Sequence, residues 1–520
     1  MIRVRKTTRI VLAAFMVWVS QAMAAASQAA ATGSATSATT EATVPHWHAV
    51  QGEWIDAFHH PFDGLEMGFD LRLRDEYNYN STSLDDQFGD SSSLDNAAKK
   101  IKHGNWNEGN AQRYRMRWST IWTLAPDVTF NTRLVWEFWT IDSPKNSYNT
   151  ASGNGRDTDL RELIFDRLNI QWKNAFDAPM TLIVGRQDIT LGTGWLVNEG
   201  TPADGSRTMY FDAVRATIDL RDKTQLDLIG ITQYDDEETW LMPFNHRDFL
   251  HVTQKTDENG FIAYLTDTSI KNTQLEAYYI YKKDEPSNWT KFWQSRSKNW
   301  STTLGQDAEI HTFGGRIAQN LDENWSYSAE VAKQFGTRND ESMKGLGTND
   351  KLVYAFNDEW KNELRTTFEY LSGDKPGTAG SERFDLLWGK WPQFQRGGEL
   401  INVVYTFETA LYDITNLYRW GIGHTFKPVK DWTFSTDYNL LWADQNTKGD
   451  SSSPSGTYGS PQYSSSGNFR GQLFSWLATY NCCKNFKTYF MLDYFVPGSY
   501  YDESTRDHAV FARVNVEWTF

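Results

Sequence analysis

The sequence predicts an all-β fold class, a single transmembrane antiparallel β-barrel of about 18 strands. Three observations support this prediction. Apolar and polar residues alternate along repeated short segments, and the connections between these segments are short and long in turn. The chain is also 15% aromatic, with 23 Trp, 24 Tyr and 30 Phe, although its mean hydropathy is only −0.61. Alternation is typical of strands with one apolar face, and membrane barrels carry aromatic residues at both interfaces.

The N-terminus predicts export. Residues 1–24 combine four basic residues before position 10, an apolar stretch over 10–20 and the small residues Ala22 and Ala24, which together are typical of a cleaved signal peptide. The cut is not followed by Cys, so no lipid anchor is expected. Residues 25–60 are predicted to form a flexible leader or periplasmic segment, rich in Ala, Ser and Thr at its start. The barrel is expected to occupy residues 61–520.

The last segment of the chain alternates most clearly. Val510, Val514 and Val516 fall on one face with Trp518 and Phe520, while polar residues fall between them. A final strand that ends on a terminal Phe is typical of the signal read by the barrel-assembly machinery. Trp518 and Phe520 are therefore predicted to be that assembly signal, which implies a bacterial outer-membrane location.

The remaining segments give the strand count. Alternation recurs at 69–74, 113–118, 130–138, 274–282, 364–370 and 432–442. Short turns are expected at 125–127, 221–223, 321–324, 427–431 and 481–485, and long polar connections at about 80–110, 141–158, 187–210, 235–257, 283–308, 336–350, 372–415, 443–470 and 496–508. Nine long loops imply nine hairpins and both termini on the periplasmic side. Residues 400–407 are placed inside the loop after the thirteenth strand. A soluble propeller is the rival fold, but no fixed repeat period is present.

Charge and cysteine content exclude several functions. The net charge of −15 argues against nucleic acid as a partner. The two cysteines, Cys482 and Cys483, are adjacent and do not form a metal-binding set, and no metal or cofactor is expected. Acidic runs at 85–95 and 235–238 are interpreted as solvated loop charge, with divalent cations bridging lipopolysaccharide as the alternative. No nucleophile elbow, P-loop, dinucleotide fingerprint or Ser/His arrangement is found, so the protein is not expected to be an enzyme.

Arginines dominate the face that should line the pore. The predicted substrate path contains Arg72, Arg74, Arg113, Arg115, Arg117, Arg133, Arg161, Arg167, Arg215 and Arg365. One interpretation is that these arginines pair with inward acids, among them Asp70, Glu76, Glu137, Glu276, Glu330 and Glu369. The other is an anion-selective constriction, because a guanidinium binds carboxylates and stays charged. The three arginines at 113, 115 and 117 are the hardest to neutralise locally.

The central stretch resembles the alginate export family of outer-membrane porins. The resemblance rests on Gly185-Arg186-Gln187, on residues 191–195, 201–207 and 210–215, and on two weaker matches, Arg161-Glu162 and 384–389. It implies a monomeric 18-stranded barrel that passes an anionic polysaccharide, with loops or a periplasmic segment as gates. Carried onto this sequence, it adds Arg186 and Arg207 to the path and points to Asp204 and Asp212. These two acids, together with Glu137 and Glu162, are predicted to act in gating or pairing. Strict alternation from Val184 would aim Arg186 outward unless the chain bends at Gly185.

The leading hypothesis is therefore a passive channel that exports an anionic polysaccharide, alginate or a related polyuronate. A general or sugar-specific uptake porin is the first alternative, and a barrel whose loops act as an adhesin or scaffold is the second. The expected partners are the polysaccharide, outer-membrane lipid including lipopolysaccharide, and the barrel-assembly machinery.

Overall fold

A computed structural model describes residues 57–81, 84–85, 108–143, 148–149, 155–156, 158–198, 210–233, 256–286, 307–389, 400–401, 404, 414–446, 463–503 and 506–520. Residues His59–Phe520 form one compact unit. The predicted signal peptide and nearly all of the predicted leader lie outside the described residues, and these assignments stay predictions. Within the described ranges, no helix combines the length and the apolar character that crossing a membrane requires.

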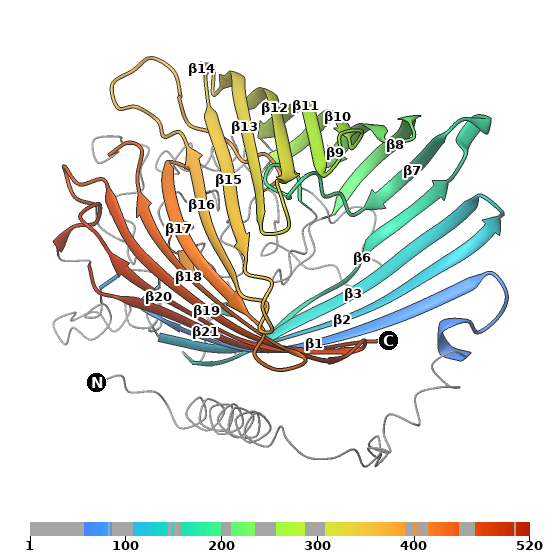
Figure 1. Cartoon of the computed structure of the whole chain (residues 1–520), viewed down its shortest axis with the longest axis horizontal. Coiled ribbons are helices and arrows are strands. Elements are labelled where there is room, and N and C mark those ends of the chain that lie inside the picture. Colours follow the sequence, from blue (N-terminus) through green and yellow to red (C-terminus); the bar gives the residue numbers. More distant parts are fainter. Residues whose placement is uncertain are drawn as a thin grey trace, which may run out of the picture. The chain divides into compact units, whose positions relative to one another are not determined.

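The compact unit is one closed antiparallel sheet (Figure 1). Its nineteen strands comprise eighteen long ones and β14 (Glu341–Met343), a three-residue strand beside β13. Closure is direct, because β1 pairs with both β2 and β21. The long strands are β1 (Leu65–Tyr79), β2 (Glu108–Ala125), β3 (Val128–Ser143), β6 (Thr158–Trp172), β7 (Met180–Gln187), β8 (Phe211–Arg221), β9 (Thr224–Gln233), β10 (Thr256–Asp267), β11 (Thr273–Pro286), β12 (Ala308–Asn320), β13 (Trp325–Arg338), β15 (Leu346–Ala355), β16 (Glu363–Leu371), β17 (Leu417–Phe426), β18 (Trp432–Trp442), β19 (Phe469–Cys483), β20 (Phe486–Pro497) and β21 (Ala509–Thr519).

The predicted count of 18 strands and the order of short and long connections are confirmed. Short turns follow β2, β8 and β17 at the predicted places, and eight of the nine predicted long connections leave the other end of the barrel. The ninth, predicted over 336–350, is only residues 339–345, because β13 and β15 extend into the predicted range and β14 lies between them. A small hairpin of β4 (Tyr148–Asn149) and β5 (Gly155–Arg156) lies in the connection between β3 and β6, and a 3-10 helix, η1 (Ala175–Asp177), lies in the turn after β6. Of residues 400–407, the described Leu400, Ile401 and Val404 are helical and buried, so they add no strand.

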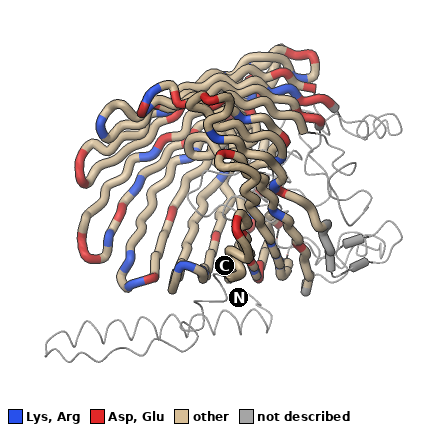
Figure 2. The backbone as a smooth tube through the Cα atoms, turned by 90° about the vertical axis from the view of Figure 1, so that its right-hand side faces the viewer, with Lys and Arg blue, Asp and Glu red and all other residues tan. Residues whose placement is uncertain are grey.

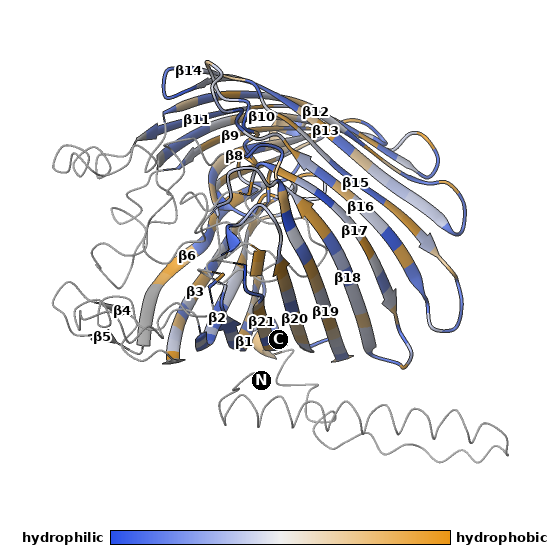
Figure 3. Ribbon diagram, turned by 90° about the vertical axis from the view of Figure 1, so that its left-hand side faces the viewer, coloured by the Kyte–Doolittle hydropathy of each residue, from blue (hydrophilic) through white to orange (hydrophobic). Residues whose placement is uncertain are grey.

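Alternation along the strands separates two faces (Figure 3). Large apolar side chains occupy the outer face, where Val184 is 45% and Trp420 is 44% exposed. Their strand neighbours on the inner face are charged or polar and mostly buried, as in the row of Asp70, Arg72 and Arg74 on β1. This arrangement is the reverse of a soluble protein, and it is what a barrel needs when its outer face meets an apolar medium and its lumen meets water.

The inner face is not polar throughout. The inner rows of β9, β10 and β12 carry the buried residues Ile229, Ile231, Ile262 and Ile310, which belong to one large apolar cluster. Two connecting segments, residues 188–198 after β7 and 381–389 after β16, contribute further members of the same cluster. We call these two segments the inner loop pair. They fold into the barrel and pack on its inner face, which the sequence did not lead us to expect.

The first and last long strands close the barrel. The Phe69 amide donates to the Phe520 carbonyl at 2.5 Å, and the Phe520 amide donates back to the Phe69 carbonyl at 2.9 Å. The two phenyl rings lie 5.3 Å apart between centroids. Phe520 thus extends the pairing of β21 with β1, and Trp518 lies on the outer face. The role of both residues as an assembly signal stays a prediction.

Candidate functional site

The predicted arginines of β1 and β2 form one wall of the lumen. With Arg513 of β21 they make a set that we call the arginine wall: Arg72, Arg74, Arg113, Arg115, Arg117 and Arg513. The strand register places Arg72 opposite Arg115 and Arg74 opposite Arg113. Like charges directly opposite each other on one face of a sheet destabilise it. The wall therefore requires carboxylates between its arginines.

Four carboxylates meet this requirement. Glu76 accepts from Arg113 at 2.9 Å and from Arg513 Nε at 2.8 Å. Asp70 pairs with Arg115 at 3.2 Å and with Arg117 at 2.5 Å. The other two are Glu517, 3.4 Å from Arg115, and Glu137, 3.7 Å from Arg113. Among the described residues, six arginines thus meet four acids.

Three further contacts describe how the arginines are held. The Arg74 guanidinium donates to Asn515 at 2.7 Å and to the Tyr489 hydroxyl at 3.2 Å, while that of Arg113 lies 4.4 Å from the Trp139 ring centre. Arg115 is 2% exposed, and within the described residues its Nε and Nη1 have no hydrogen-bond partner. Ion pairing, which was one of the two interpretations of the sequence, is therefore present. Arg115 still has N–H groups that donate no hydrogen bond within the described residues.

Neighbouring strands carry a balanced group of charges. Arg133 of β3 donates to Asp166 at 2.6 Å and holds Asp188 through two bonds of 2.9 Å, and Arg167 also donates to Asp188. Asp166 is an extra residue in β6, since Arg133 faces Arg167 and Leu134 faces Phe165. Asp188 lies in the connection beyond β7. Burial alone would raise its pKa, but Arg133 and Arg167 hold the pKa below its ordinary value.

Two further predicted arginines each have one main acid. Arg215 donates to Asp227 at 2.8 Å, and Arg365 to Asp437 at 2.6 Å. Further lumen cations, some of which the predicted path omitted, also pair with acids: Lys282 with Glu258 and Asp284, Arg316 with Glu276, Arg338 with Asp385 and Arg419 with Glu369. Their place on an inner row was the signal that could have found them. Basic and acidic positions are interspersed along the strands (Figure 2).

Arg186 lies apart from the arginine wall. It forms a two-bond pair with Asp212, at 2.9 Å for each bond, and donates to the Phe165 carbonyl at 2.9 Å. Its guanidinium lies 3.6 Å from the ring centre of Tyr210. Strict alternation would expose Arg186 beside Val184, but it is only 5% exposed. The preceding Gly185 has a φ of +116°, a conformation that favours glycine, and the bend expected there is present.

Several predicted residues lie beyond what can be placed. Arg207 and Asp204 lie outside the described residues, as do the acidic runs except Asp85. Arg161 and Glu162 belong to β6, although only their backbone is described. Cys482 and Cys483 are free, with their sulfurs 3.0 Å apart. Among the described residues, no group of three His, Cys, Asp or Glu side chains could hold a metal ion.

Two tryptophans fasten the inner loop pair to the wall. Trp195 is fully buried, donates from Nε1 to Glu369 at 3.2 Å and stacks on Phe384. Trp388 is 1% exposed and donates from Nε1 to Glu258 at 2.8 Å. The segments also pair with each other, because the Trp388 amide donates to the Leu196 carbonyl at 3.0 Å. The inner face therefore carries a fixed apolar body over one group of strands and guanidinium groups over another.

Comparison with known proteins supports this architecture. A family model described as alginate export matches residues 63–515. Three similar solved structures are Acinetobacter baumannii OccAB2 (TM-score 0.53, 9% identity, covering 87% of this chain and 98% of that one), Acinetobacter baumannii OccAB3 (0.52, 10%, 87% and 99%) and Pseudomonas aeruginosa OpdQ (0.50, 12%, 88% and 97%). At these identities the similarity shows the fold alone. Among curated protein sequences there is no match.

Proposed function

The chain belongs to the alginate export family and is a porin-type β-barrel channel of the bacterial outer membrane, and on this premise we propose that it exports an acidic polysaccharide, alginate or a related polyuronate. The observation that carries the proposal is the arginine wall, where six arginines meet four carboxylates. A polyuronate presents one carboxylate per sugar, and guanidinium groups bind carboxylates in a planar fork.

The wall favours passage over tight retention. Each of Arg113, Arg115 and Arg117 already pairs with a carboxylate of the protein. A substrate carboxylate must therefore compete with that partner for the guanidinium group, which weakens its binding. Conduction needs binding that is strong enough for entry and weak enough for exit. A barrel has no energy source, so synthesis and the concentration gradient drive the motion. No catalytic step is part of the proposal.

A sugar-uptake porin is the second candidate, because part of the lumen has the features it requires. Basic and acidic groups balance around Arg133, Arg167, Asp166 and Asp188. Tyr264 and Tyr278 stack on the inner face with centroids 5.3 Å apart, although the apolar cluster buries both rings. Anion selectivity separates the two candidates, since only the export proposal depends on an excess of positive charge.

Reversal potentials in planar bilayers test the proposal. The parent protein is expected to select anions. The triple change Arg113→Glu, Arg115→Glu and Arg117→Glu is expected to reduce or reverse this selectivity, because it replaces three of the wall's six positive charges with negative ones. Arg117→Gln removes one of these three positive charges with less risk to folding, because the Arg117 side chain is more exposed than those of Arg113 and Arg115.

The control is Arg221→Glu, which makes one such Arg-to-Glu change at an exposed residue at the end of β8. It should leave the reversal potential where it is. Cation selectivity in the parent protein would contradict the proposal whatever the variants do.

A further inference from the structure

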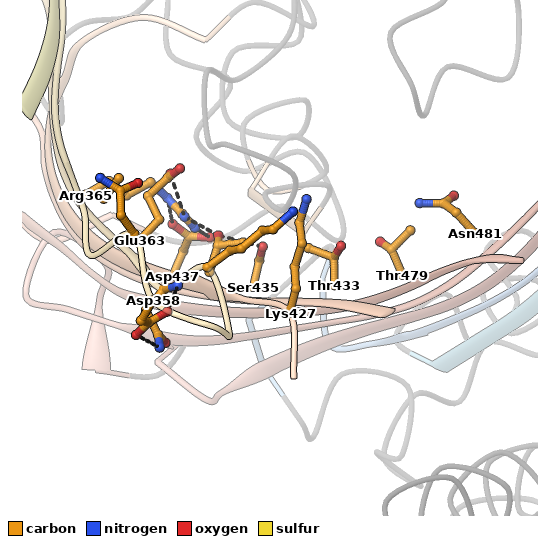
Figure 4. Close-up of a pocket in the computed structure, with 14 residues that line it drawn as sticks. Asp358, Glu363, Arg365, Lys427, Thr433, Ser435, Asp437, Thr479 and Asn481 are labelled. Carbon is orange, nitrogen blue, oxygen red and sulfur yellow. Dashed lines mark hydrogen bonds and ion pairs between the residues drawn. The ribbon is translucent and has the colours of Figure 1, made fainter. Parts of the chain in front are cut away.

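A cavity of about 630 Å³ opens on the inner face at the turn ends of β15 to β19 (Figure 4). It lies at the end of the barrel opposite the long connections and is separate from the arginine wall, which β21, β1 and β2 form. Every lining residue except Ala355 is polar or charged. None of the contacts of the arginine wall or the inner loop pair uses these residues.

One part of the cavity is a fixed, neutralised floor. Arg365 of β16 reaches across β17 to Asp437 of β18 through two bonds of 3.0 and 2.6 Å. Gly423 lies between them, and a Cβ there would stand 2.2 Å from Asp437 Oδ1. Arg365 also donates to Thr425 at 2.6 Å, and the Thr425 and Ser435 hydroxyls are 2.9 Å apart. These groups satisfy one another, so they position the cavity and do not act as its binding groups.

The acids at the rim are also engaged. Asp358, in the turn after β15, accepts from the Asn362 backbone amide at 2.9 Å and from its side-chain amide at 2.6 Å. These bonds hold the pKa of Asp358 below its ordinary value, the backbone bond being the larger cause. Glu363 lies 4.0 Å from Arg365.

A second part of the cavity carries polar side chains that are not held by hydrogen bonds or ion pairs within the described residues. We call it the turn-side shelf, made of Lys427, Thr433, Thr479 and Asn481. Within the part of the chain that the structure describes, these four side chains make no hydrogen bond or ion pair. Thr433 and Thr479 are directly opposite each other in the register of β18 and β19. The side chains of Lys427, Thr433 and Thr479 rise into open space (Figure 4).

We propose that the turn-side shelf is a binding subsite for one uronate residue of an acidic saccharide, at the channel end where the turns lie. The two hydroxyls and the amide are suited to a sugar's hydroxyls, and the Lys427 ammonium to its single carboxylate. Opposed residues on neighbouring strands stand about 5 Å apart, so several hydroxyls of one ring can be met together. The inference rests on the proposed function and adds a place where the substrate is first held.

The charge of the cavity supports a single acidic sugar over a stronger polyanion. Lys361, Arg365 and Lys427 balance Asp358, Glu363 and Asp437, so the lining is formally neutral. A neutral lining does not accumulate anions, and the shelf itself carries one point charge, the Lys427 ammonium. Hydroxyl and amide contacts then supply the rest of the binding, which keeps it reversible.

The test measures block of ion current through the full-length protein in planar bilayers. A trimeric uronate oligosaccharide is added to the turn side, and its carboxyl-reduced counterpart is the neutral probe. Lys427→Gln should weaken block by the uronate about tenfold and leave block by the reduced probe unchanged. The double variant Thr433→Val with Thr479→Val should weaken block by both probes severalfold, because it removes hydroxyls and keeps side-chain size.

Matched controls lie beside the shelf. Lys430→Gln changes an exposed lysine in the same turn, and Thr436→Val changes a threonine of β18 on the outer face. Both should block as the parent does. If the shelf variants also block as the parent does while Arg117→Gln weakens block, the shelf is not a subsite and the proposed function stands. If the parent is not blocked by the uronate from either side, the proposed function fails and this inference with it.

Discussion

The arginine wall and the apolar inner rows of β9 to β12 are built from the same kind of strand, yet their inner faces differ. In the arginine wall, every second residue of β1 from Asp70 to Glu76 is charged and buried. In β9, the corresponding row runs Asp227, Ile229, Ile231, with both isoleucines almost completely buried. The first row forms an ion-pair network, whereas the second belongs to the apolar cluster that includes Trp388 of the inner loop pair.

The difference shows what determines the inner face of a barrel. The outer face is apolar all round, so alternation marks a strand wherever the inner face is polar. Where a loop folds inward, the inner face must also bury apolar surface, and alternation weakens because both faces become apolar. A strand with two apolar faces therefore indicates an inward loop, and a strand with an alternating pattern indicates an open stretch of lumen.

Removing the anchor of the inner loop pair should produce the largest effect. Trp388→Ala deletes a fully buried indole and its bond to Glu258, and should lower the free energy of unfolding by about 4 kcal/mol. Conductance should rise, because the apolar body loses its attachment. Single-channel recording and heat-shifted electrophoretic mobility measure the two effects. Trp388→Phe, which keeps a ring, is the control, and an unchanged conductance in Trp388→Ala would show that the loops do not narrow the channel.

Removing an acid from the centre of the arginine wall should have a different effect. Glu76→Gln takes the shared carboxylate from Arg113 and Arg513, and should lower the free energy of unfolding by about 3 kcal/mol because two buried cations lose their partner. Anion selectivity should increase while conductance changes little. The reversal potential and denaturation measure the two effects. A loss of anion selectivity would mean that Glu76 does not set the charge of the lumen.

Acidification should act on the apolar side and not on the arginine wall's guanidinium groups. Burial raises the pKa of Asp385, but Lys282, Arg338 and further donors outweigh it and hold the pKa well below its ordinary value. Because the pKa of Asp385 is lower in the folded protein than in the unfolded chain, its charge stabilises the inner loop pair. This stabilisation is complete at pH values above the unfolded pKa, near 4, and it is lost as the pH falls through the folded pKa.

The expected outcome is a small rise in conductance only below about pH 4. Asp385→Asn should show that rise already at pH 7, because it loses the charge that Arg338 holds at 2.6 Å. Conductance measured from pH 7 to pH 3 tests this. A transition of the parent protein above pH 5 would assign the response to another group.

Much of this architecture could be predicted from the sequence. The 18 strands and eight of the nine long connections follow from the outer apolar rows, which depend only on alternation. The inner place of Arg72, Arg113 and Arg133 follows from the same period. The inward position of Asp166 could not be predicted in this way, because a one-residue bulge in β6 interrupts the alternation of inner and outer residues.

The inward loops were missed for a different reason. Residues 188–198 lack any strand or helix period, so their path depends on contacts with distant strands such as the bond from Trp195 to Glu369. The apolar run Trp195-Leu196-Val197 inside a polar connection was the available signal, since an exposed loop has no reason to carry it. The pairing of each arginine likewise required the register, which alternation alone does not provide.

The seam between β1 and β21 also determines when the arginine wall can form. The bonds from Arg513 to Glu76 and from Arg74 to Asn515 join residues 437 and 441 positions apart in the chain. Contacts of such sequence separation carry the full cost of loop closure, so they form only after the intervening strands are in place. The positive surface of the lumen is therefore completed at the final step of folding, and a substitution in it should delay barrel closure as well as alter transport.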